Sequence, residues 1–104
     1  MSKFNIVDIW RDRYGDSNEE YDHAGRKMLI SAHTNPNSRY QPTIDHIRPL
    51  SKGGLDVLEN IEICNRYTNF EKGDKFPHWK ANGRRFHAEK MKNTSHGYIV
   101  VEDK

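Results

Sequence analysis

The stretch Ile44–Pro77, which reads IDHIRPLSKGGLDVLENIEICNRYTNFEKGDKFP, decides the fold expected for this 104-residue chain. Residues 40–48 are predicted to be extended, and the glycine pair in Ser51–Gly54 predicts a loop after them. Asn60–Cys64 places two isoleucines on one face, which is the period of a half-buried strand. A short helix over Arg66–Glu71 follows. We therefore expect two paired strands and a helix that returns across them.

Outside this stretch, the pattern predicts further elements on both sides. Asn5–Tyr14 has the apolar spacing of a short amphipathic helix. Tyr21–Ala32 is expected to be extended with a bend or bulge at Gly25, and a hairpin can join this run to residues 40–48. Toward the C-terminus, Tyr98–Val101 is a β-branched run that predicts a last strand.

Length and composition indicate one small α+β domain, residues 1–104. The hydrophobic fraction is 34% and the charged fraction 31%, so the core is expected to be thin. The single cysteine, Cys64, excludes an intrachain disulfide and lies in an apolar run typical of a buried position. The sequence has no apolar run long enough for a signal peptide or a membrane span. We expect a soluble protein of a reducing, intracellular compartment.

The net charge of +2 indicates little about partners, but its distribution is uneven. Basic residues concentrate between Lys72 and Lys92, where the acidic residues are Asp74 and Glu89. A basic second half suits a polyanion such as nucleic acid. A solvated basic surface explains the same pattern, so charge alone leaves both interpretations open.

Three polar residues of the central stretch have the chemistry of a phosphodiester hydrolase. Asp45 and His46 are adjacent, and the predicted helix brings Asn69 back across the strands. Mg²⁺ accepts few oxygen ligands from protein and keeps several waters, so the Asp45 carboxylate and the Asn69 amide oxygen suit it. His46, with an ordinary pKa of about 6.5, can accept a proton from water at neutral pH.

The same stretch resembles the HNH, or ββα-metal, nuclease family, and is similar to small phage and bacterial HNH endonucleases and to the HNH module of CRISPR effector nucleases. The family pattern is an Asp-His pair, a proline, a glycine-rich turn, an Asn-apolar strand, and an Asn or His three residues before a lysine. This chain matches it with Asp45-His46, Pro49, Gly53-Gly54, Asn60-Ile61, and Asn69 before Lys72. The resemblance covers about residues 40–77, and it implies a ββα-metal core with an N-terminal helix and extra short strands.

The resemblance also implies a role for each matched residue. His46 corresponds to the general base that activates the attacking water, and Asp45 to the metal-binding carboxylate. Asn69 stands where His or Asn binds the same metal. Asn60 corresponds to a structural residue that pins the loop between the strands and is no ligand. For Lys72, a phosphate contact and a structural salt link are both open.

The chain departs from many family members, which carry two C-x-x-C pairs that bind a structural zinc. Cys64 alone cannot form such a site, so no structural zinc is expected. Packing of aromatic side chains is expected to replace the zinc, with five candidates: Trp10, Tyr67, Phe70, Phe76 and Trp79.

Three arginines are further candidates for nucleic-acid contacts. Arg48 lies two residues after the expected base and is a candidate for stabilising the scissile phosphate. Arg84 and Arg85 are candidates for outlying contacts with the phosphate backbone.

The resulting expectation is an endonuclease that uses Mg²⁺ or Mn²⁺ and acts on DNA in preference to RNA. The resemblance implies a 5′-phosphate and a 3′-hydroxyl product, and a cytoplasmic setting in a bacterial or phage-infected cell. A single site cuts one strand, so a double-strand break requires a homodimer or two events. Two alternatives stay open: a binding module without catalysis, and a toxin or subunit whose activity depends on a partner protein.

Overall fold

The computed structural model describes residues 2–104, and its first element is helix α1, Ile6–Tyr14. The helix begins where the Asn5 side chain accepts hydrogen bonds from the backbone N–H groups of Val7 and Asp8, at 2.9 and 3.2 Å. It ends at Gly15, which has a φ of +60°. Ile9 and Trp10 are buried on its inner face. The helix expected at Asn5–Tyr14 is therefore confirmed.

A short hairpin of β1 (Glu19–Tyr21) and β2 (Lys27–Leu29) follows. Its turn forms around Asp22, whose Oδ1 accepts from the backbone N–H groups of Ala24 and Arg26, at 3.0 and 2.9 Å. The prediction of one extended run over 21–32 was wrong, because the chain reverses at this turn and then forms a 3₁₀ turn at Ile30–Ala32. A hairpin between this run and residues 40–48 was also wrong, since β2 pairs with β1.

The central hairpin pairs β3 (Pro42–His46) with β4 (Ile61–Asn65) in antiparallel register, with Asp45 opposite Glu62. Helix α2, Arg66–Lys72, follows directly: the Asn65 side chain caps its first turn and Gly73, with a φ of +56°, ends it. The expected order of strand, loop, strand and helix is confirmed.

The C-terminal part is a three-stranded antiparallel sheet of β5 (His78–Ala81), β6 (Arg84–Lys90) and β7 (Tyr98–Glu102), in that order. Asn82 and Gly83 join β5 to β6 with positive φ angles of 53° and 74°, as a tight hairpin turn requires. The expected last strand is present. The sequence analysis missed β5 and β6, of which β6 has one buried aromatic, Phe86, among mostly polar residues.

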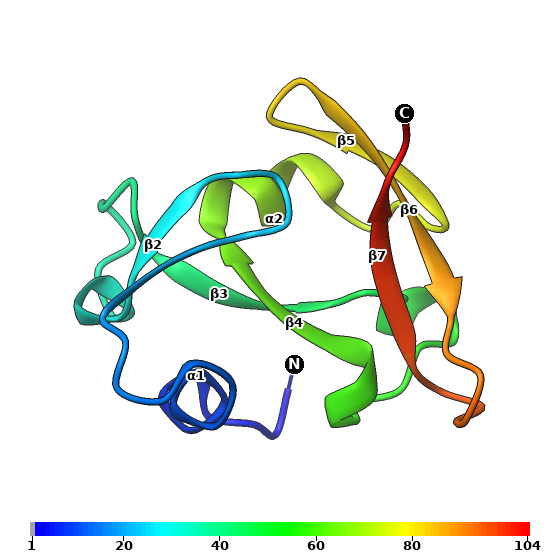
Figure 1. The fold of residues 1–104 in the computed structure, drawn as a ribbon, viewed down its shortest axis with the longest axis horizontal. Coiled ribbons are helices and arrows are strands. Elements are labelled where there is room, and N and C mark those ends of the chain that lie inside the picture. The colour runs from blue at the N-terminus through cyan, green and yellow to red at the C-terminus, as the bar shows by residue number, and fades with distance from the viewer. Residues whose placement is uncertain (1) are drawn as a thin grey trace.

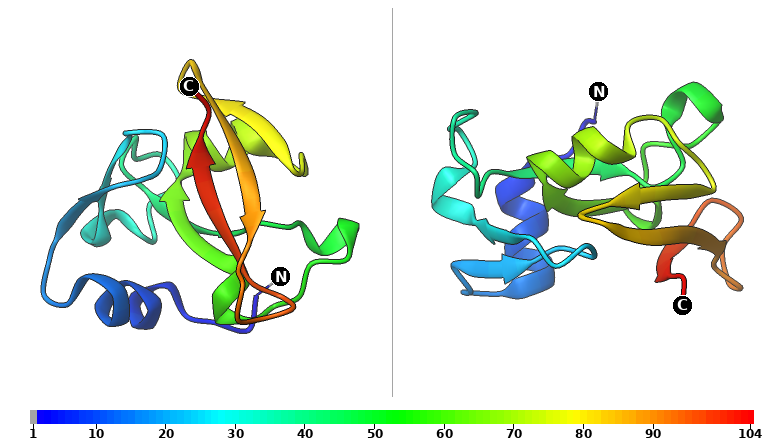
Figure 2. Two further views of the ribbon diagram at one scale, coloured as in Figure 1. Left: turned by 45° about the vertical axis from the view of Figure 1, so that its right-hand side comes forward. Right: turned by 90° about the horizontal axis from the view of Figure 1, so that it is seen from above.

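Two apolar clusters lie on either side of the β3–β4 hairpin. Figure 1 shows α1 and α2 on opposite sides of this hairpin, with the β5–β7 sheet beside it, and Figure 2 shows the same layers from two further directions. One cluster joins α1 to β4 through Trp10, Ile61 and Ile63. The other joins the hairpin's far end to the sheet through Trp79 and Phe86. The α+β class is confirmed.

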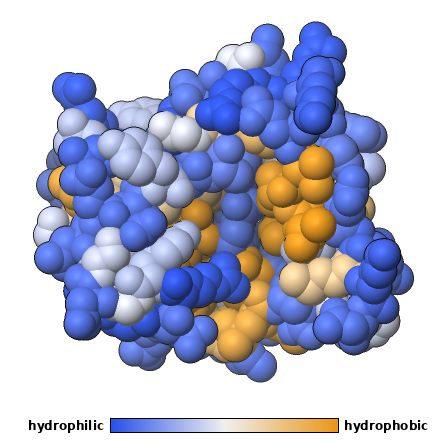
Figure 3. All heavy atoms as spheres, viewed as in Figure 1, coloured by the Kyte–Doolittle hydropathy of each residue, from blue (hydrophilic) through white to orange (hydrophobic). Residues whose placement is uncertain are grey.

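One face of the molecule has an apolar hollow at its surface. Figure 3 shows apolar side chains gathered along a hollowed strip of the face that is turned to the viewer. A hollow of about 440 Å³ lies between β4 and β7 and is lined mainly by apolar side chains, including Ile61, Met91, Ile99 and Val100. Within residues 2–104, neither α1 nor α2 has the length and apolarity that a membrane crossing requires.

Candidate active site

An open hollow of about 270 Å³ lies between the end of β3 and α2, and the principal candidate residues line it. Asp45 and His46 are the last two residues of β3, and Asn69 lies in the middle of α2. All three line the hollow, together with Ile44, Pro49, Leu50, Gly73 and Asp74. Asp45 and His46 are neighbours at the end of β3, where alternation along a strand gives their side chains different directions, and His46 also lines the hollow beside Ser2.

Asp45 is a buried carboxylate, with 4% of its surface exposed. The Lys72 ammonium lies 3.4 Å from its Oδ2, which has no hydrogen-bond donor in the structure. The pKa of Asp45 is raised to about 7, chiefly by burial. The Lys72 ammonium opposes this shift, and the nearby Glu62 carboxylate contributes to it. Oδ2 is thus buried against the Lys72 ammonium, which is the cation nearest to it.

Lys72 is fully buried, with no exposed surface. Its Nζ donates to the backbone oxygen of His46 at 3.1 Å and lies 5.0 Å from the centre of the Trp79 ring. These contacts support the salt link with Asp45 and contradict the assignment of Lys72 to nucleic-acid binding, because a phosphate at the surface cannot reach the ammonium. The physical reason is that Lys72 faces the hairpin, on the inner side of α2.

Asn69 is held against β3 by its amide nitrogen, which donates to Thr43 Oγ1 at 3.0 Å and to the Ile44 backbone oxygen at 3.3 Å. These bonds leave the amide oxygen to accept from another partner. Carboxylate and amide oxygens, the types that Asp45 and Asn69 carry, are among the ligands that Mg²⁺ and Mn²⁺ accept from proteins. Among residues 2–104, no group of three or more His, Cys, Asp or Glu side chains is arranged around one metal position.

His46 has an ionised partner that the sequence analysis missed, namely Asp56. His46 Nε2 lies 2.8 Å from Asp56 Oδ1, and the carboxylate also accepts from the Lys3 backbone N–H and the Ser2 hydroxyl, at 2.7 and 2.8 Å. The Lys3 and His46 hydrogen bonds are the main causes that lower the pKa of Asp56 to about 2.

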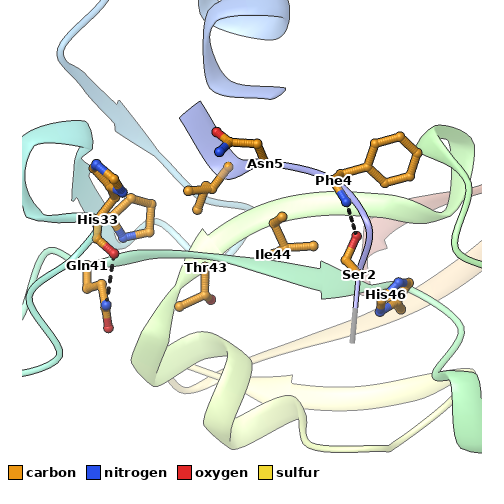
Figure 4. A pocket seen from close by; sticks show the side chains of 10 residues that line it. Ser2, Phe4, Asn5, His33, Gln41, Thr43, Ile44 and His46 are labelled. Atoms are coloured by element: carbon orange, nitrogen blue, oxygen red, sulfur yellow. Dashed lines mark hydrogen bonds between the residues drawn. The ribbon is translucent and has the colours of Figure 1, made fainter. Parts of the chain in front are cut away.

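An ionised carboxylate can only accept, so His46 donates to Asp56 from Nε2. In the neutral imidazole with this hydrogen bond, the lone pair lies on Nδ1. Figure 4 shows His46 at the end of β3 beside Ser2, at one end of a second hollow of about 560 Å³ that extends to His33 and Gln41. Asp56 is one of several carboxylates in the sequence, and only the tertiary contact distinguishes it.

Asn60 is fully buried and connects the two ends of the β3–β4 loop. Its Oδ1 accepts from the Arg48 backbone N–H at 2.9 Å, and its Nδ2 donates to the backbone oxygens of Arg48 and Leu55, at 3.0 and 2.9 Å. A Cβ added at Gly54 would collide with the Arg48 backbone oxygen, so this turn requires glycine there. These contacts are those of a structural residue.

Two of the three arginines proposed for nucleic-acid contacts are engaged within the protein. The Arg48 guanidinium donates to the Lys52 backbone oxygen at 2.7 Å and to the Tyr98 hydroxyl at 3.1 Å. Arg84 forms a two-point ion pair with Glu102, at 3.0 and 2.6 Å, and also donates to the Ala24 backbone oxygen. These contacts occupy part of each guanidinium, and the phosphate contacts expected for Arg48 and Arg84 stay predictions. Arg85 is exposed on β6.

The aromatic residues expected to replace a zinc fall into two groups. Trp10 and Trp79 are buried in the two clusters, and Phe76 packs against the second. The packing role was wrong for Tyr67 and Phe70, which are 45% and 84% exposed. Thr68 and Lys72 occupy the inner side of α2 instead.

The candidate site thus combines a buried carboxylate, an amide oxygen and an imidazole oriented by a second carboxylate. Its residues come from a strand, the following loop and a helix, with the N-terminal segment bracing Asp56. This set of groups can hold a divalent cation and accept a proton from water. Comparison of the chain with protein-family models, with curated proteins and with solved structures found no match.

Proposed function

We propose that this protein is a metal-dependent endonuclease of the HNH type that hydrolyses phosphodiester bonds of nucleic acid, with DNA preferred. The observation that carries the proposal is the convergence of Asp45, His46 and Asn69 on one hollow, at the junction of a β-hairpin and the helix that follows it. The matched motif of residues 40–77 supports the same assignment, because its spacing corresponds to these three positions.

The proton transfer in this proposal belongs to His46. Its Nδ1 takes a proton from water, and the water oxygen bonds to phosphorus while the bond from phosphorus to the 3′ oxygen breaks. The 3′ oxygen takes a proton from solvent, which leaves a 3′-hydroxyl and a 5′-phosphate. Asp56 is a positioning residue in this step, since it fixes the tautomer and stabilises the imidazolium that forms.

Asp45 and Asn69 are the proposed ligands of Mg²⁺ or Mn²⁺. Their place in the lining of one hollow supports this role, as does the Asn69 amide oxygen, which the hydrogen bonds of the amide nitrogen leave free to accept. A bound cation would supply positive charge against the phosphate and the departing oxygen. Lys72 holds the Asp45 carboxylate in position through their ion pair.

Supercoiled plasmid provides the test. Purified protein is incubated with Mg²⁺, Mn²⁺ or EDTA, beside His46→Ala and a matched control, His96→Ala, at an exposed histidine of the β6–β7 loop. We expect nicked or linear plasmid with either metal, none with EDTA, and a loss of about 10²- to 10⁴-fold in rate for His46→Ala alone. Absence of cleavage with every metal, while DNA binding persists, would support a binding module or a partner-dependent protein instead.

A further inference from the structure

Helix α2 exposes two aromatic side chains on its outer side. Phe70 is 84% exposed and Tyr67 45%, and their spacing of three residues puts them on the same side of the helix. The inner side is occupied by buried Thr68 and Lys72. Neither ring is needed for the core, so their position calls for a role at the surface.

The two rings line a hollow of about 540 Å³ together with Thr43, Arg66 and Asn69. Asn69 also lines the candidate active site, and Thr43 accepts the hydrogen bond that holds Asn69 against β3. The aromatic hollow is therefore adjacent to the candidate active site, and Asn69 lines both.

The charge of this hollow suits a polyanion. Arg66 is its single ionic residue, and the guanidinium carbon lies 5.3 Å from the centre of the Tyr67 ring. No carboxylate lines the hollow, and within residues 2–104 Arg66 forms no salt bridge. A phosphate can therefore pair with Arg66, which lies over the Tyr67 ring, while the Phe70 ring stays exposed.

We infer that Tyr67 and Phe70 form a stacking platform for an unpaired base beside the cleavage site, so that the substrate is single-stranded or locally unpaired nucleic acid. The inference rests on the proposed function. A paired base in a duplex exposes its edges, whereas stacking on a side chain requires its face. Arg66 is the single ionic residue of the lining, and Asn69 also lines the candidate active site. Both observations favour nucleic acid over an apolar protein segment.

The test measures binding without cleavage. Fluorescence anisotropy in EDTA compares three labelled oligonucleotides: a single strand, its full duplex, and the single strand with abasic positions. Phe70→Ala removes the ring, Phe70→Trp keeps an aromatic face, and Phe70→Leu keeps apolar area without one. Tyr21→Ala is the matched control, because Tyr21 is an aromatic on β1 with 59% exposure.

We expect the single strand to bind more tightly than the duplex and the abasic strand. Phe70→Ala and Phe70→Leu should weaken single-strand binding by about tenfold, while Phe70→Trp and Tyr21→Ala bind as the unchanged protein does. The platform is overturned if Phe70→Ala or Phe70→Leu binds the single strand at full affinity, if the duplex binds best, or if no oligonucleotide binds. Loss of self-association in Phe70→Ala, seen by light scattering with unchanged oligonucleotide binding, would identify an interface between copies instead.

The platform and the nuclease can fail separately. Plasmid cleavage that needs His46 but is insensitive to Phe70→Ala, together with unchanged oligonucleotide binding, removes the platform and keeps the nuclease. Single-strand binding that needs Phe70, without cleavage under any metal, keeps the platform and removes the nuclease.

Discussion

At the scale of single residues, Asp45 is a buried carboxylate whose Oδ2 lies against the buried ammonium of Lys72. Isolated buried charges are unfavourable, so the pair with Lys72 offsets only part of the cost of removing the carboxylate from water. Two consequences can be measured on the folded protein without any substrate: how it responds to metal, and how its stability depends on pH.

Divalent cations should stabilise the protein through Asp45. With Mn²⁺ at a hundred times its dissociation constant, the free energy of unfolding should rise by about 2.7 kcal/mol, which raises Tm by roughly 10 °C in a domain of this size. Calorimetry of Asp45→Asn should show no such rise, while Asp16→Asn, at an exposed aspartate, behaves as the unchanged protein does. An equal rise in both variants would place the cation elsewhere.

Without metal, the pH profile of stability should carry the signature of a raised carboxyl pKa. The folded pKa of Asp45, about 7, lies above its ordinary value of 3.8, so the folded state binds more protons between these values. Its contribution to stability is therefore lost as pH rises from about 4 through 7. Urea unfolding in EDTA should give a flatter profile for Asp45→Asn than for the unchanged protein, and parallel profiles would contradict the assignment.

Removal of the buried ammonium should be strongly destabilising. Lys72→Met leaves the Asp45 carboxylate without its partner, and we expect a loss of about 3–5 kcal/mol in the free energy of unfolding. Lys80→Met, at an exposed lysine of β5, should change stability by less than about 0.5 kcal/mol in the same urea titration. A small effect at Lys72 would mean that the pair contributes little at neutral pH.

At the scale of elements, the β3–β4 loop holds the site in shape. Asn60 ties its two ends together, and Asp56, in the same loop, holds His46 and the N-terminal segment. Hydrogen bonds of Asn60 and Asp56 thus position the loop. Asn60 is fully buried, and a buried polar group is costly to leave unpaired.

Truncation of the loop anchor should therefore lower stability. Asn60→Ala removes three hydrogen bonds and leaves the Arg48 backbone groups without them, so we expect a loss of about 1–3 kcal/mol by thermal unfolding. Asn93→Ala, at an exposed position of the β6–β7 loop, is the matched control and should be close to neutral. Equal Tm values for the two variants would contradict a structural role for Asn60.

At the scale of the whole molecule, the two helices and the C-terminal sheet cover different sides of one central hairpin (Figure 1). This arrangement buries the Asp45–Lys72 pair between α2 and β3 and leaves the aromatic side of α2 open. It also engages the guanidinium groups of Arg48 and Arg84 in hydrogen bonds within the protein.

Under the proposed function, nucleic-acid binding should depend on Arg85 and should weaken strongly as the salt concentration rises. Arg85→Ala should weaken binding and reduce the slope of log affinity against log salt by about one, because one phosphate contact is lost. Arg84→Ala should leave the salt slope unchanged, since Glu102 already neutralises that guanidinium. Anisotropy titrations at several salt concentrations measure both, and affinity independent of salt would contradict phosphate-driven binding.

The sequence by itself determined the elements that depend on local signals. The cap at Asn5, the alternation in β4 and the glycine after α2 act within a few residues, so α1 and the strand–loop–strand–helix order of the central stretch could be predicted. The early hairpin was missed because its turn depends on the Asp22 carboxylate, and β6 because it has little apolar alternation.

Tertiary structure alone decided how the side chains are used. The outward position of Tyr67 and Phe70, the burial of Lys72 and the partnership of His46 with Asp56 all depend on which element covers which face. Arg84 pairs with Glu102 between the neighbouring strands β6 and β7. Residue type and spacing define the roles that each side chain can take. Burial and long-range partners decide which role it has, because they set the dielectric surroundings and the available hydrogen bonds.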